Sequence, residues 1–389
     1  MSENISAYTA ILKTYPKFKE TTLSGRYITT DHILPLLNKF EDKFELSIIG
    51  QSTLNEFIYS IQLGSGKTKI LMWSQMHGNE STTTKAIFDL LNAFYNLNED
   101  SFLNEILDSC SLYIIPILNP DGAKAYTRVN ANEIDLNRDA NDLKEIESKL
   151  LRKVFDEFKP DFCFNLHDQR SIFSAGSAEF PATLSFLTPS MDPERRITPS
   201  REISMKVIAA ISKDLYEKIP NRIGRYDDAY NSNCTGDTFQ SLEVPTILFE
   251  AGHIANDYLR EQTREYVLAA LISGLYAVST KTYELHSTLE YFEIPQNEKF
   301  FYDVILRNAI VNHEVVDIAI QYKEILKNGR IIFQGIVENI ASNLAFYAHL
   351  QIDCKNNPVT LPDKTEISEN VIVDEILFKN EILMINYEK

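Results

Sequence analysis

Three residues in two separate segments place imidazole and carboxylate side chains where they could bind a metal ion. His77 and Glu80 are three residues apart in the segment MHGNE, directly after the apolar stretch 69–75, and His167 follows another apolar run. A spacing of three lets both side chains of a tight loop turn toward one point, and Gly78 lets the chain bend there. Catalytic zinc is commonly held by two histidines and one glutamate, with a fourth position left for water.

Each of these residues also has an ordinary structural explanation. Glu80 near the start of a helix would be stabilised by the positive end of the helix dipole without any metal. His167 could be a hydrogen-bonded core histidine. The sequence holds only seven histidines, however, and two of them at strand ends beside a carboxylate favour the metal site. The HExxH pattern of helix-borne zinc proteases does not occur in the sequence.

Further charged residues could bind and activate a substrate. Arg128 lies in the segment YTRVN, and Arg138 follows ten residues later in IDLNR. Since a planar guanidinium group binds a carboxylate through two parallel hydrogen bonds, the arginines suggest an anionic substrate, although ordinary surface salt bridges are the alternative. Glu250 ends the apolar stretch 245–249. It could act as a general base and acid, or be a structural acid paired with an arginine.

The elements that must position these residues alternate between strands and helices. Strand-like runs cover residues 44–50, 57–63, 69–75, 111–118, 161–166 and 245–249, and helical patterns begin at Ser81 and cover about 140–158 and 258–280. This alternation predicts an α/β fold, with a mixed, largely parallel sheet flanked by helices. Ligands of such sheets gather at the carboxyl ends of strands, where the segments HGNE, NPDG, NLHD and FEAGH all lie.

The sequence pattern changes near residue 285. After it come short strand-like runs without long helices, so we predict a catalytic domain over 1–285 and a small β-rich C-terminal domain over 286–389. We expect the β domain to be structural. The alternative is a lid or a dimer contact that limits the size of the substrate.

Composition excludes some classes of function. The formal charge of −17 argues against nucleic acid and anionic membranes as partners. No stretch of about 18 apolar residues and no signal-peptide pattern is found, and the four cysteines form no CxxC pair. We therefore expect a cytoplasmic protein. The oligomeric state is not predicted.

The motifs HGNE, NPDG, DLNR and NLH, followed by a glutamate after an apolar strand, resemble in their order those of the M14 family of zinc carboxypeptidases. The resemblance covers about residues 65–280 and implies that family's fold and one zinc ion per chain. It implies zinc ligands at His77, Glu80 and His167, the catalytic glutamate at Glu250, the oxyanion-side arginine at Arg128, and a carboxylate clamp at Asn137 and Arg138. It also implies that Asp135 hydrogen-bonds the first zinc histidine.

Two positions do not follow the family pattern clearly. His167 is followed by Asp168, where digestive members carry a serine. The family tyrosine that flanks the substrate matches either Tyr226 or Tyr230, and the spacing does not choose between them.

The resemblance implies a metallocarboxypeptidase that hydrolyses the C-terminal amide bond of a peptide or peptide-like substrate with a free carboxylate. Aspartoacylase and succinylglutamate desuccinylase share the zinc site and the distal glutamate, so an N-acyl amino acid amidohydrolase is the alternative. A third hypothesis is an inactive member that binds zinc and peptides, against which Glu250 and Arg138 both argue.

Overall fold

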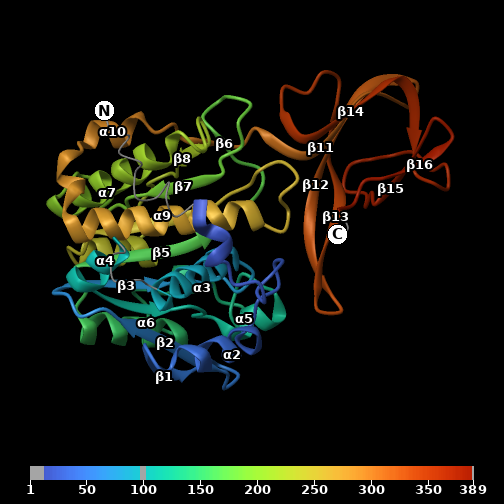
Figure 1. Ribbon diagram of the computed structural model, residues 1–389. Helices are drawn as coiled ribbons and strands as arrows, with labels where there is room; N and C mark the ends of the chain where they lie inside the picture. Colours follow the sequence, from blue (N-terminus) through green and yellow to red (C-terminus); the bar gives the residue numbers. More distant parts are fainter. Residues whose placement is uncertain (1–12, 97–101, 388–389) are drawn as a thin grey trace.

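The computed structural model describes residues 13–96 and 102–387, which form an α/β part and a β-rich part (Figure 1). The α/β part is built on one eight-stranded sheet. In spatial order its strands are β1 (Glu45–Gln51), β2 (Phe57–Leu63), β4 (Cys110–Ile115), β3 (Thr68–Trp73), β5 (Phe162–Asp168), β9 (Thr246–Ala251), β7 (Leu184–Leu187) and β8 (Ile223–Arg225). The central strands β4, β3, β5 and β9 are parallel to one another, and β7 is parallel to β8. The predicted mixed, largely parallel sheet is confirmed.

Helices cover both faces of this sheet, because its central strands are apolar on both sides. In β3, Ile70 and Met72 pack into one core cluster, and Leu71 and Trp73 pack into the other. The first cluster is covered by α2 (Thr30–Phe40), α3 (Thr82–Tyr95), α4 (Leu103–Ser109), α7 (Pro199–Tyr216) and α9 (Glu261–Thr280). The second is covered by α6 (Ile146–Phe158) and α8 (Thr235–Ser241). None of the helices in the described ranges is long and apolar enough to span a membrane.

Shorter elements connect these layers. They are η1 (Tyr15–Lys17), α5 (Pro120–Ala125), η2 (Leu136–Arg138), η3 (Thr282–Leu285), α10 (Thr288–Glu293), and the paired strands β6 (Ser174–Ala175) and β10 (Asn297–Glu298).

The helix predicted over residues 140–158 begins later than expected, at Ile146. The Asp139 carboxylate accepts hydrogen bonds from two backbone N–H groups just before the helix, at 2.9 and 2.8 Å. Leu143 adopts a left-handed conformation with φ of 49°. An Asp-capped turn therefore precedes the helix, since such local hydrogen bonds compete with helical ones.

The β-rich part is a six-stranded sheet with its own core, drawn in orange and red in Figure 1. In spatial order its strands are β13 (Arg330–Ala341), β12 (Glu314–Lys327), β11 (Phe301–Val311), β14 (Tyr347–Thr360), β15 (Glu375–Phe378) and β16 (Glu381–Met384). Only β11 and β14 run parallel among these neighbours.

The junction between the two parts lies close to the predicted division at 285/286. Helix α10 follows that division, yet its Tyr291 and the following Ile294 are buried in the first core cluster. The core of the β-rich part begins with Val304. The division remains a proposal, and we propose to place it after Ile294.

Candidate metal centre and active site

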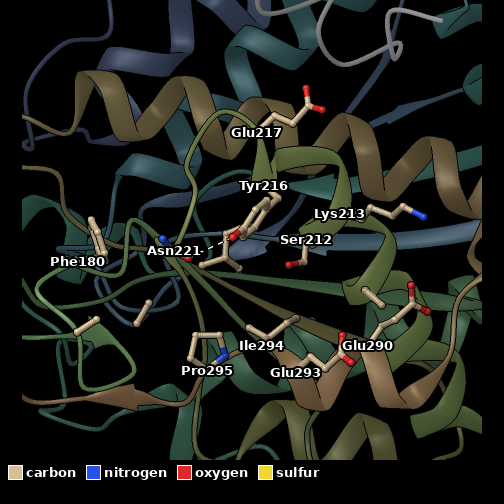
Figure 2. A pocket seen from close by; sticks show the side chains of 14 residues that line it. Phe180, Ser212, Lys213, Tyr216, Glu217, Asn221, Glu290, Glu293, Ile294 and Pro295 are labelled. Atoms are coloured by element: carbon tan, nitrogen blue, oxygen red, sulfur yellow. Dashed lines mark hydrogen bonds between the residues drawn. The ribbon is translucent and has the colours of Figure 1, made fainter.

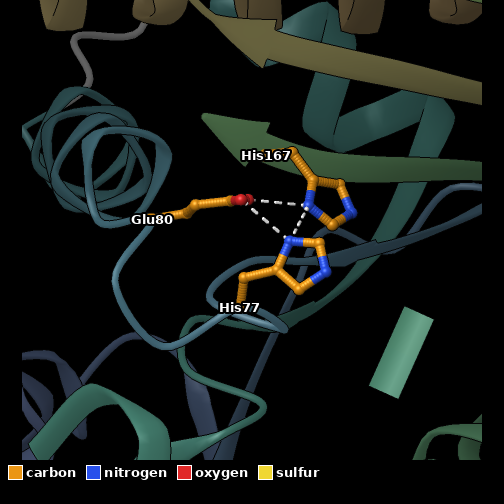
Figure 3. Close-up of side chains that lie close together, drawn as sticks. All are labelled: His77, Glu80 and His167. Atoms are coloured by element: carbon orange, nitrogen blue, oxygen red, sulfur yellow. Dashed lines mark hydrogen bonds and ion pairs between the residues drawn. The ribbon is translucent and has the colours of Figure 1, made fainter. Parts of the chain in front are cut away.

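Two loop residues and one strand residue converge at the carboxyl edge of the central strands. His77 and Glu80 come from the loop between β3 and α3, and His167 lies near the end of β5 (Figure 3). His77 Nδ1 lies 2.9 Å from Glu80 Oε1, His167 Nδ1 lies 2.8 Å from Glu80 Oε2, and the two Nδ1 atoms are 3.0 Å apart. All three side chains are almost completely buried.

The donor set fits a metal cation. His77 Nε2 lies 3.1 Å from Asp135 Oδ1 and can donate its proton there, which leaves the Nδ1 lone pair facing Glu80 and His167. Two imidazole nitrogens and a carboxylate then face one another with more lone pairs than protons to share between them. A bound cation accepts these lone pairs and removes their mutual repulsion. Their spacing approaches the roughly 3.4 Å between ligands that each lie about 2.1 Å from a tetrahedral zinc ion. These three residues also form the metal-capable cluster found in the described part of the chain.

The loop that carries His77 and Glu80 is shaped by close packing. The chain turns at Gly78, as expected, although Gly78 has no left-handed backbone conformation. Instead, a Cβ atom at this position would lie 2.0 Å from the carbonyl carbon of Gly122, so only glycine fits against that backbone. Ser81 is the N-cap residue of α3, so Glu80 directly precedes a helix. A helix start and a metal-ligand geometry therefore coincide at Glu80.

Arg128 and Asp135 flank the cluster. Arg128 Nε donates to Asp135 Oδ2 at 3.0 Å, and its Nη1 lies 3.3 Å from Glu80 Oε1. The Arg128 side chain is 47% exposed, so part of the guanidinium group is free to meet a ligand at the edge of the centre. Asp135 thus contacts both His77 and Arg128, which is the arrangement expected of a residue that orients a metal ligand.

Glu250 lies on β9, directly opposite His167 of β5 in the parallel pairing. It is buried, and its Oε2 has no hydrogen-bond partner among the described residues. Burial and the nearby charges of Glu80 and Asp168 raise the pKa of Glu250 well above its ordinary value. A carboxyl group in this setting binds a proton more readily than an exposed one.

The structure separates the two candidate tyrosines. Burial, together with the charges of Glu250 and Glu80, raises the pKa of Tyr226, which therefore lies within electrostatic reach of the centre. Its ring packs against Phe173. Within the described ranges, no hydrogen bond or ring contact links either tyrosine to the residues of the centre, so only the electrostatic effect of Glu250 and Glu80 on Tyr226 distinguishes them, and the choice of Tyr226 stays a proposal.

Asn137 and Arg138 make other contacts than Arg128 does. Asn137 Oδ1 accepts hydrogen bonds from the backbone N–H of Thr235, at 3.0 Å, and from Cys234 Sγ, at 3.4 Å, at the start of α8. Arg138 Nη1 donates to the carbonyl oxygen of Asn137 at 2.6 Å. Their role as a clamp for the substrate carboxylate stays a prediction.

Sequence reasoning missed a buried charge network behind the centre. The backbone N–H of Asp168 donates to Glu80 Oε2 at 3.2 Å, and its carboxylate lies 3.8 Å from Arg26. Arg26 is buried and forms a 3.0 Å ion pair with Glu324 of β12, which also accepts a hydrogen bond from the Tyr126 hydroxyl. The C-terminal sheet is therefore linked to a metal-ligand candidate. Arg26 and Glu324 lie in segments with no local signal of function.

Two cavities are relevant to the location of a ligand. One of about 450 Å³ is lined by Glu80, Arg128 and Asp168 and, on its other side, by residues of β12 and β13. A larger one, of about 840 Å³, lies beside α7 and α10 and contains none of the predicted site residues (Figure 2). There, Tyr216 donates a 3.2 Å hydrogen bond to Asn221, and no metal-capable cluster of the described residues lies nearby. The chemistry therefore points to the smaller cavity.

Comparison with known proteins identifies a family that part of this chain resembles. Residues 32–174 match the family model described as zinc carboxypeptidase, peptidase M14. Carboxypeptidase 2 of Trichophyton rubrum is 27% identical over 115 residues, which cover 29% of this chain and 20% of that protein. The matched segment thus spans only about a fifth of this curated relative.

Solved structures share the fold. A metallo-carboxypeptidase from Burkholderia cenocepacia has a TM-score of 0.51 and 16% identity, over 66% of this chain and 70% of that chain. A metallo-carboxypeptidase from Pseudomonas aeruginosa, solved in complex with (2-guanidinoethylmercapto)succinic acid, has a TM-score of 0.52, 16% identity and the same two coverages. The family match over residues 32–174 and the shared fold confirm the resemblance of the α/β part of this chain to the M14 zinc carboxypeptidases.

Proposed function

We propose that this protein is a zinc-dependent metallocarboxypeptidase that hydrolyses the C-terminal amide bond of peptides or peptide-like substrates. The family match and the fold support a hydrolase that acts on peptide bonds. The observation that carries the proposal is the convergence of His77, Glu80 and His167 next to the buried carboxyl group of Glu250.

These residues divide the reaction between them. When bound, zinc supplies Lewis acidity toward the scissile carbonyl and lowers the pKa of a water molecule to about 7. Glu250 takes the proton of the attacking water and passes it to the leaving amine. Its burial directly opposite His167 in the sheet places it next to the metal centre for both tasks.

The remaining predicted residues bind and orient. Arg128, partly exposed at the edge of the centre, donates to the oxygen on which negative charge develops. Asp135 fixes the ring of His77. Arg138 and Asn137 hold the terminal carboxylate of the substrate, which makes the enzyme an exopeptidase, and Tyr226 flanks the bound substrate.

The test compares the zinc-loaded protein with its Glu250→Gln variant on peptides with a free C-terminus. We expect turnover to fall at least 100-fold in the variant while zinc content and substrate binding are retained. Glu243→Gln, an exposed change on the same segment, serves as the control and should keep full activity. Equal turnover in the wild type and in Glu250→Gln would refute the assignment of Glu250 as the general base and acid. A wild type that binds zinc and peptide but shows no turnover would indicate a binding protein.

Hydrolysis of N-acyl amino acids remains the second candidate. The observation that favours it is that residues of β12 and β13 line the cavity beside Glu80 and limit the space for the acyl part of a substrate. A panel of C-terminal peptides and N-acyl amino acids, assayed with zinc, separates the two activities by their relative kcat/KM.

A further inference from the structure

The cavity beside the metal centre is not lined by Asn137 or Arg138, the predicted carboxylate clamp. Glu80 and Arg128 form one wall, and β12 and β13 form the other. Asn137, next to Arg138, contacts the start of α8 instead. If the C-terminal carboxylate of a substrate is held at Arg138 and its amide bond lies at the metal centre, the N-terminal remainder must extend into this cavity.

The far wall of the cavity is held in place by buried polar contacts. Glu324 of β12 forms a 3.0 Å ion pair with the buried Arg26 and accepts a hydrogen bond from the Tyr126 hydroxyl. Gln321 Nε2, also buried, donates to Ser171 Oγ at 3.0 Å. Separating the two parts would break the Arg26–Glu324 ion pair and the Gln321–Ser171 hydrogen bond. These contacts hold the wall against the α/β part.

A second set of contacts fixes the same wall further from the centre. Tyr258 donates a 2.9 Å hydrogen bond to the buried carboxyl group of Asp303 on β11, the neighbour of β12. His349 Nε2 lies 2.8 Å from the carbonyl oxygen of Ser171, and its ring packs on that of His253. The C-terminal sheet is thus attached at several points around the cavity.

Size and polarity define what the cavity can hold. Its volume of about 450 Å³ is in the lower half of the range of about 300–1,000 Å³ for small-molecule sites, which leaves room for only a few amino-acid residues. Eight of its fifteen lining residues are charged, four of each sign. Such a surface suits the amide groups and charged ends of a short peptide, and it disfavours a long aliphatic chain.

We propose that β12 and β13 form the end wall of the subsite for the acyl part of the substrate, so that the enzyme cleaves short polar peptides with no more than about two residues before the scissile bond. Ile336 on β13 is the aliphatic side chain in this wall and sets its depth. This inference rests on the proposed carboxypeptidase function. It assigns the C-terminal sheet a part in substrate selection, beyond the structural role expected from the sequence.

The test is a ladder of peptides that share one C-terminal residue and carry one, two, four or eight residues before it. With zinc-loaded full-length protein, we expect kcat/KM to fall at least tenfold between two and four residues. Ile336→Ala deepens the cavity and should raise the ratio of kcat/KM for four residues to that for one residue at least threefold. Ile336→Trp fills the cavity and should lower the ratio for two residues to one residue by a similar factor.

Ile332→Trp is the matched control, since Ile332 lies four residues earlier on the same face of β13, is also half-buried, and does not line the cavity. Thermal melts establish whether each variant is folded. If one of the two Ile336 variants fails to fold, the other still tests the proposal, because each is expected to change the kcat/KM ratio in its own direction. Equal kcat/KM for all four lengths in the wild type overturns this inference and leaves the proposed function standing. Cleavage of no peptide at any length refutes the proposed function, and this inference falls with it.

Discussion

Replacing Asp135 tests whether the contact behind His77 supports the metal centre. Its Oδ1 lies 3.1 Å from His77 Nε2, and its Oδ2 accepts a 3.0 Å hydrogen bond from Arg128. Losing the partner of a metal-bound histidine usually lowers metal affinity by 10–100-fold, or about 1.4–2.7 kcal/mol. We expect Asp135→Asn, which keeps an acceptor oxygen, to lose about tenfold, and Asp135→Ala to lose about 100-fold because Arg128 is then left with Glu80 alone.

Zinc affinity is measured by competition with a chromogenic chelator at fixed pH. Asp142→Asn is the control, because Asp142 lies in the same region, is exposed, and pairs only with Lys144 in the ion pairs of the described chain. The control should bind zinc as the wild type does. If Asp135→Ala holds zinc within threefold of the wild-type affinity, the argument that Asp135 orients His77 is wrong.

Three further changes probe the scaffold. Arg264→Met leaves Asp89 buried without the guanidinium group that binds it at 2.5 and 2.6 Å. This change should lower the free energy of unfolding by about 3–5 kcal/mol in denaturant titrations, and a loss below about 1 kcal/mol contradicts the argument. Gly78→Ala forces a Cβ atom to within 2.0 Å of the Gly122 backbone, so zinc content should fall while far-UV circular dichroism is unchanged, and full zinc binding would refute the packing argument. Burial raises the pKa of Asp303 to about 6, whereas the same carboxyl group titrates near pH 4 in the unfolded chain. The folded protein therefore binds this proton more tightly than the unfolded chain does. The stabilisation that results is present below pH 4 and is lost as the pH rises through 6. Asp303→Asn should therefore gain stability relative to the wild type between pH 4 and 7, by roughly 3 kcal/mol at most, and a pH-independent difference would contradict the assignment.

The central sheet could be predicted because its signals are local. The residues of β3 are apolar on both faces, which identifies a strand covered on both sides, and polar residues follow directly where such strands end. Since the carboxyl ends of parallel strands lie at one edge, His77 and His167 could be placed together from sequence order alone. Helix α7 also carried a signal that was overlooked, because Thr198 caps it and Pro199 occupies its first turn.

The contacts that reach across the chain could not be predicted. Arg26 and Glu324 come from the two ends of the sequence, and only the docking of the C-terminal sheet brings them together behind Asp168. The reason for Gly78 was also hidden, because it depends on the approach of Gly122 from a different segment. Tyr226 and Tyr230 are equivalent in sequence, and only the electrostatic proximity of Tyr226 to Glu250 separates them.

The most direct test of the account is the zinc content of the purified protein, measured by plasma mass spectrometry after loading with zinc and dialysis. We predict one zinc ion per chain in the wild type and less than about 0.1 in His77→Ala and in His167→Ala, roughly tenfold lower or more. The control His286→Ala should also hold one zinc ion per chain, because the side chain of His286 pairs with Glu290 of α10 instead. A wild-type protein without stoichiometric zinc, or full zinc retention in either ligand variant, would contradict the central claim.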